Sequence, residues 1–133
     1  MSTNSQIITA ALRALRIVGE GESASAAQSA DALAILNQML EAWSVEGIDL
    51  QYFAQTDVSA ACPIPAWSER GVIACLALEL AADYGAELTA AVAKRADEGY
   101  QTIARECLNA RLQPADMSHL GGGQGRYNIL TDT

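Results

Sequence analysis

The feature that most constrains the fold is one long helix signal over residues 25–47. Ser25 and Gln28 have the spacing of a capping box, in which each side chain satisfies a free backbone N–H group of the first turn. Gly47 can adopt the left-handed conformation that ends a helix. Apolar side chains recur at helical spacing between these ends: Leu33, Leu36, Leu40 and Trp43. The predicted helix is a rod of about 33 Å, so other helices must pack against its apolar stripe.

Three further segments have a helical pattern, over residues 3–19, 65–85 and 89–111. The first begins with a second capping box, Thr3 with Gln6, and the third ends at Gly85. The glycine-rich turn between the first two helices is short, which favours a helical hairpin. The sequence therefore predicts a mainly α fold, a four-helix bundle.

Two segments lack this pattern. Residues 49–65 contain aromatic and β-branched side chains and two prolines, which predicts a short extended or β connection between the second and third helices. Residues 113–133 have no period, three consecutive glycines and few apolar side chains. We therefore expect a bundle domain over residues 1–112 and a flexible C-terminal arm over residues 113–133.

Composition excludes several classes of protein. The chain has 133 residues, 50% of them hydrophobic, which is enough for one packed core. Sixteen acidic residues against eight basic ones give a net charge of -8, and the scattered bases argue against a nucleic-acid-binding stripe. The apolar runs are too short to span a bilayer, and the polar N-terminus does not predict a signal peptide. Three widely spaced cysteines predict buried thiols rather than disulfides.

Candidate catalytic and ligand-binding groups are weak. His119 is the only histidine and lies in the predicted arm, which cannot hold a base beside its nucleophile unaided. The glycines of residues 121–125 lack the flanking strand, helix and Lys-Ser/Thr pair of a phosphate-binding loop. Two carboxylate pairs, Glu41 with Glu46 and Asp83 with Glu87, are interpreted as solvated helix faces. We predict no enzyme activity, no metal and no cofactor.

The aromatic residues fall into two groups. Trp43 and Trp67 lie on predicted apolar stripes and are expected in the core. Tyr52 and Phe53 are adjacent in an extended segment, so their side chains must point to opposite faces. Whichever of the two is exposed is the first candidate for a contact with another subunit or with a tail protein.

The order of these blocks resembles a known family. Residues 12–50 form an Ile/Leu-rich helix with a Gly-Glu turn, followed by an Ala/Leu helix that closes on Trp43, Ser44, Glu46 and Gly47. Residues 69–85 end in an Ala-x-x-Tyr-Gly motif. Both blocks are similar to those of the head-to-tail connector proteins of short-tailed bacteriophages, also called packaged-DNA stabilisation or tail accessory proteins. The segment at residues 51–65 is shorter than the hairpin-bearing insertion of many relatives.

This resemblance implies a structural adaptor of the virion, assembled in the host cytoplasm. Such adaptors form closed rings of roughly twelve copies under the portal protein, retain packaged DNA and provide the platform for the tail proteins. DNA would pass through the lumen without specific binding, and no membrane is involved. The resemblance also implies that the C-terminal arm docks on the portal. The candidate residues are Gly121, Gly122, Gly123, Arg126, Tyr127, Asn128, Ile129 and Leu130.

Two other functions remain open from the residues alone. A small cell-wall polysaccharide hydrolase could use one of the carboxylate pairs. A dimeric cytoplasmic regulator could use the same helical bundle.

Overall fold

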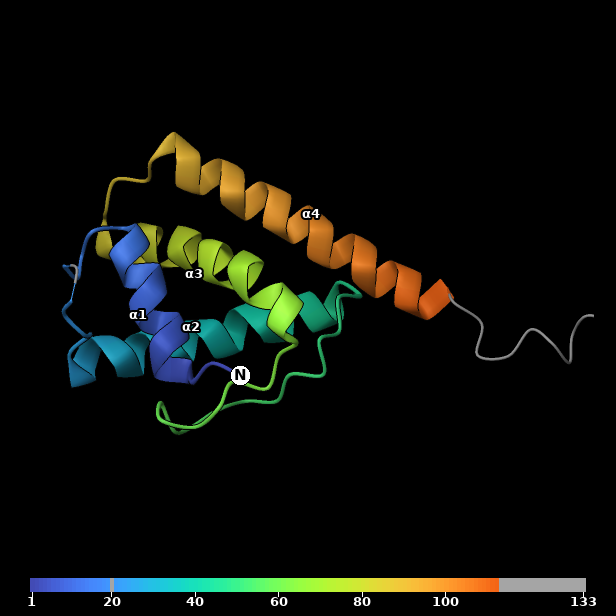
Figure 1. The fold of residues 1–133 in the computed structure, drawn as a ribbon, viewed down its shortest axis with the longest axis horizontal. Coiled ribbons are helices and arrows are strands. Elements are labelled where there is room, and N and C mark those ends of the chain that lie inside the picture. Colours follow the sequence, from blue (N-terminus) through green and yellow to red (C-terminus); the bar gives the residue numbers. More distant parts are fainter. Residues whose placement is uncertain (20, 113–133) are drawn as a thin grey trace, which may run out of the picture.

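The computed structural model describes residues 1–19 and 21–112 as a bundle of four α-helices and one short 3-10 helix (Figure 1). The helices are α1 (Asn4–Ala14), α2 (Ala26–Val45), η1 (Ala66–Ser68), α3 (Glu69–Tyr84) and α4 (Ala90–Leu112). The connection between α2 and η1 contains only an isolated bridge, Thr3 with Ala61. The predicted mainly α fold is thus confirmed, and the predicted C-terminal arm lies outside the described residues.

Local sequence signals account for most helix ends. The Ser25 side chain accepts the N–H of Gln28 at 3.2 Å, and the Gln28 side chain accepts the N–H of Ser25 at 3.0 Å. Thr3 and Gln6 form the same reciprocal pair at the start of α1. Gly47 and Gly85 have φ angles of 97° and 63°, which are left-handed conformations that end α2 and α3. Both predicted capping boxes and both predicted glycine ends are confirmed.

The first helix is shorter than predicted because Arg16 interrupts it. Arg16 has a φ of 60°, and its N–H donates to Arg13 O at 3.0 Å while that of Ile17 donates to Leu12 O at 3.0 Å. This is the hydrogen-bond pattern of a Schellman motif, normally built on glycine. Leu15 and Val18 remain buried beyond the helix end, so the predicted apolar stripe continues without helical backbone.

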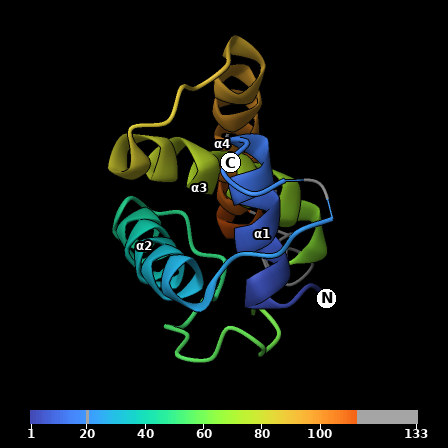
Figure 2. The same cartoon turned by 90° about the vertical axis from the view of Figure 1, so that its left-hand side faces the viewer.

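Helix α3 is the centre of the bundle. It packs against α1, α2 and α4, and Figure 1 shows it between α4 and α2. In the end-on view of Figure 2, α1 and α2 lie beside it with their axes in different directions. Leu76, Leu80 and Val72 of α3 are completely buried, as are Ile7, Ile8 and Leu12 of α1. The long helix α2 therefore borders the core that α3 fills.

Helix α4 approaches α3 through two glycines. A Cβ atom placed on Gly99 would lie 2.6 Å from the Cα atom of Gly71, and one on Gly71 would lie 2.7 Å from the Cδ1 atom of Ile103. Nearby, the Cys75 thiol lies 3.4 Å from the carbonyl oxygen of Ala96. No side chain fits between the two backbones, so the crossing requires glycine on both helices.

We predict that Gly99→Ala destabilises the bundle. The added methyl group meets backbone, which cannot rotate away, and overpacking of this kind costs about 2 kcal/mol. This loss exceeds the gain of about 1 kcal/mol that alanine brings to a helix interior. Urea denaturation should therefore show a lower free energy of unfolding than for the natural chain.

The matched control is Ala34→Gly, at an exposed position in the middle of α2. It measures the difference in helix propensity between alanine and glycine at a position where the methyl group is not crowded. A Gly99→Ala chain that is more stable than the natural one would contradict the close approach.

Candidate interaction surfaces

The connection between α2 and η1 is held against the bundle by Asn4, a completely buried polar residue. Its Nδ2 atom donates to Gln55 Oε1 at 3.1 Å and to the carbonyl oxygen of Asp57 at 3.0 Å. The backbone N–H groups of Asn4 and Ser5 donate to the carbonyl oxygens of Ala60 and Val58. The first turn of α1 therefore fixes the path of a segment more than 50 residues away in sequence.

Asn37 of α2 fixes the other side of this connection. Its Oδ1 atom accepts the backbone N–H of Gln55 at 2.9 Å and the hydroxyl of Tyr52, and its Nδ2 atom donates to Gln55 O at 2.9 Å. Tyr52 is half-buried against the core, and burial raises the pKa of its phenol. Phe53 points away and is 65% exposed. The predicted opposition of Tyr52 and Phe53 is confirmed, and the contact role of Phe53 remains a prediction.

The expected core position of Trp67 is wrong. Trp43 is 7% exposed and packs edge to face on Tyr100, with ring centroids 5.4 Å apart, as predicted for a core residue. Trp67, by contrast, is 53% exposed. The turn that contains it is the 3-10 helix η1, whose geometry places Ser68 rather than Trp67 in the interior.

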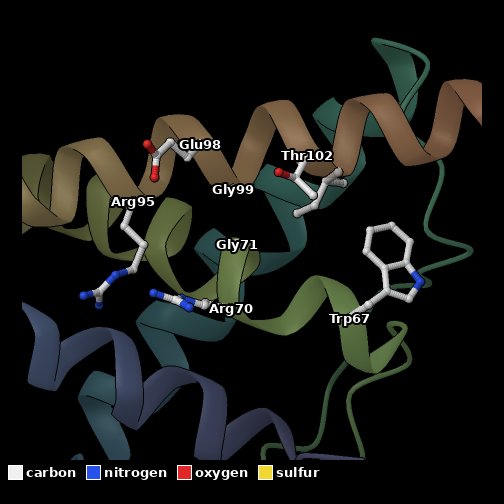
Figure 3. A pocket seen from close by; sticks show the side chains of 8 residues that line it. Trp67, Arg70, Gly71, Arg95, Glu98, Gly99 and Thr102 are labelled. Carbon is white, nitrogen blue, oxygen red and sulfur yellow. The ribbon is translucent and has the colours of Figure 1, made fainter.

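Trp67 stands at one end of a hollow of about 270 Å³ beside the glycine crossing (Figure 3). Arg70 of α3 and Arg95 of α4 lie at its other end, with Gly71 and Gly99 between (Figure 3). We call this hollow the basic groove. The sequence pattern alone does not predict this groove, although two glycines inside apolar helical patterns indicate a close helix approach.

A second hollow of about 400 Å³ lies on the other side of Trp67, toward the end of α4. It is lined by Leu50, Pro65 and Ala110, among others. Leu108, an apolar residue within the predicted fourth helix, is 47% exposed, because the neighbouring Cys107 takes the buried position. Figure 1 shows the end of α4 projecting past the other helices, where less core is available to cover it.

The cysteine thiols are buried, whereas the candidate carboxylates are exposed to solvent. The three cysteines are free and buried, as predicted, and burial raises the pKa of Cys62 to about 11 and that of Cys75 to about 12. These thiols are therefore protonated and poorly nucleophilic at neutral pH. The carboxylate pairs are exposed, in agreement with their interpretation as solvated groups, although only Glu41 and Asp83 lie on helices: Glu46 follows the end of α2, and Glu87 lies between α3 and α4.

Several predicted sites lie outside the described residues. They are His119, the glycine-rich run of residues 121–125 and the arm residues up to Leu130. Within residues 1–19 and 21–112, no helix is both long and apolar enough to cross a membrane.

The described residues thus define a helical bundle, and the side chains of Phe53, Trp67, Arg70 and Arg95 are exposed on its surface. The family model of the P22 tail accessory factor matches residues 1–133. The chain therefore belongs to this family of phage tail accessory factors and is a virion component. A search of curated proteins finds no match. The resemblance found in the sequence is confirmed.

We predict that Asn4→Ala loosens the connection between α2 and η1. The change leaves Gln55 Oε1 and the carbonyl oxygen of Asp57 without their donor, which costs about 2 kcal/mol. Urea denaturation should show this loss, and limited proteolysis should cleave residues 49–65 faster. Thr56→Ala, at an exposed position of the same connection, is the control and should change stability by less than about 0.5 kcal/mol. Equal effects of the two variants would contradict the anchoring role of Asn4.

Proposed function

We propose that this phage tail accessory factor is a structural head-to-tail adaptor without enzyme activity. It forms a ring of roughly twelve copies under the portal, retains packaged DNA and provides the platform on which the tail proteins assemble. The single observation that carries this proposal is the match of the tail accessory family over residues 1–133.

The surface of the bundle supports an assembly role. Phe53 and Trp67 are 65% and 53% exposed on segments that hydrogen bonds and helix packing hold in place. Exposed aromatic side chains on a rigid framework are typical of protein interfaces, because little conformational entropy is lost when they bind. We assign Phe53 to a contact with another subunit or with a tail protein.

The charge of the chain supports a duct for DNA. Each copy carries a net charge of -8, so a ring of copies has a strongly negative potential. DNA phosphates are repelled by such a surface, and DNA could slide through the lumen without specific binding.

The segment at residues 113–133 is the proposed portal-docking arm. Its glycines are followed by Arg126, Tyr127, Ile129 and Leu130, which can anchor on a partner surface or sheet edge. Residues 1–112 form the proposed adaptor domain.

The first test measures the mass of the chain by native mass spectrometry, alone and after mixing with a portal ring from the same source. We expect a portal complex that carries a full ring of copies. A chain that ignores the portal and stays a monomer or dimer would overturn the proposed function.

Deletion of residues 121–133 should abolish portal binding and leave the bundle folded, because the arm supplies anchors and no core. Circular dichroism and urea denaturation check the fold, and the mass of the portal mixture checks binding. Full-strength binding by the truncated chain would exclude the docking role of the arm.

Phe53→Ser should weaken assembly without loss of stability. The side chain is largely exposed, so the free energy of unfolding should change by less than about 0.5 kcal/mol. The portal complex should then carry fewer copies or fail to bind the tail protein. Tyr52→Phe is the matched control, since loss of the hydroxyl bond to Asn37 costs about 1 kcal/mol of stability and leaves the surface intact. Complexes of natural composition with Phe53→Ser would exclude Phe53 as a contact.

A further inference from the structure

The basic groove contains two arginines that form no salt bridge with any residue the structure describes. Among the residues that the structure describes, the only ion pair is Lys94 with Glu98, at 3.9 Å. Glu98 also borders the groove, and its ion pair with Lys94 partly neutralises its negative charge. Arg70 and Arg95 are exposed, and Figure 3 shows both side chains on one side of the crossing. The groove therefore offers two guanidinium groups and an exposed indole, the side-chain types that dominate binding energy at protein interfaces.

The crossing keeps this groove open and fixes its shape. Gly71 and Gly99 have no side chains to fill the space between Trp67 and the two arginines. At these glycines the two backbones are already in contact, so α3 and α4 cannot approach more closely. The arginines are therefore held on two helices at a fixed separation, which suits a partner with carboxylates at matching positions.

The opposite side of α3 carries the complementary charge. Arg70 and Glu79 are nine residues apart, or about two and a half helical turns, which places them on opposite faces of α3. Asp83, one turn beyond Glu79, lies on the same face. Glu46 at the end of α2 borders a hollow of about 240 Å³ together with Glu79. We call Glu46, Glu79 and Asp83 the acidic face, and all three are exposed.

Apolar surface accompanies the acidic face, as Trp67 accompanies the basic groove. Val45, next to Glu46 in the chain, is 87% exposed. Tyr84 lies near Asp83 of α3 and Asp31 of α2, and burial together with these two charges raises the pKa of its phenol. Each side of the molecule thus has an exposed apolar side chain beside its charged groups.

We propose that the basic groove of one copy binds the acidic face of a second copy of this chain. Two different, complementary patches on opposite sides of one molecule produce a head-to-tail contact, which closes into a ring when the rotation between copies is right. A twofold dimer would instead bring each patch against itself, and like charges would repel. This inference rests on the proposed ring and names the surfaces that join its subunits.

The test reverses one charge on each side of the contact. Arg95→Glu and Glu79→Arg are made singly and together, and each chain is mixed with the portal ring. Each single reversal places like charges across every contact and should weaken filling of the ring by about tenfold. The double variant restores opposite charges across every contact and should recover the full ring.

The matched control is Arg16→Glu, which makes the same change in net charge as Arg95→Glu at an exposed arginine outside both surfaces. It should fill the ring as the natural chain does. Circular dichroism of each variant establishes that the bundle is folded before the mass is measured.

The outcomes separate the contact from the proposed function. If the natural chain fills the ring and the single variants fill it equally well, the contact is overturned and the adaptor function stands. Single variants that fail without rescue in the double variant also overturn this pairing of surfaces. A natural chain that does not bind the portal overturns both proposals. Tight binding of a short DNA duplex that Arg95→Glu abolishes would show that the groove is a phosphate site instead.

Discussion

The contact between Gly71 and Gly99 is the constraint on which the arrangement of the bundle depends. Because the two backbones meet without intervening side chains, α4 packs directly on α3 at this point. That position brings Tyr100 against Trp43 on one side of the crossing, where the Tyr100 hydroxyl donates to Glu46 at 2.7 Å. On the other side it leaves the basic groove open. One pair of small residues thus determines both a core contact and the shape of a surface.

Helix starts and the buried stripes of α1 and α2 could be predicted because they depend on residues within a few positions of each other. The capping box of Ser25 and the glycine end at Gly47 need no knowledge of the rest of the chain. Trp67 and Leu108 show the limit of prediction from such local signals. Whether a side chain on a helical stripe is buried depends on a neighbour that covers it, and the 3-10 turn at η1 and the projecting end of α4 remove that neighbour.

The candidate surfaces were harder to predict because tertiary hydrogen bonds position them. The alternation of Tyr52 and Phe53 followed from extended backbone, but which side chain faces outward was decided by Asn37, whose amide binds Gln55 and Tyr52. Asn4 has an equivalent role from α1. From the sequence alone, an asparagine that anchors a distant segment cannot be distinguished from any other polar residue of a helix. The partners of Asn4 and Asn37 lie 15 or more residues away in the sequence, so neither period nor spacing indicates them.

Charge explains why an adaptor of this kind would assemble only on a template. Copies that each carry a net charge of -8 repel one another in solution, and this repulsion opposes a free ring. A local contact between opposite charges directs the orientation of neighbours more than it adds affinity. In the proposed ring, the portal therefore has to supply the free energy that overcomes the repulsion. The surfaces on α3 and α4 then determine how neighbouring copies are oriented. In the proposed ring, the same net charge would also leave the DNA in the duct unbound.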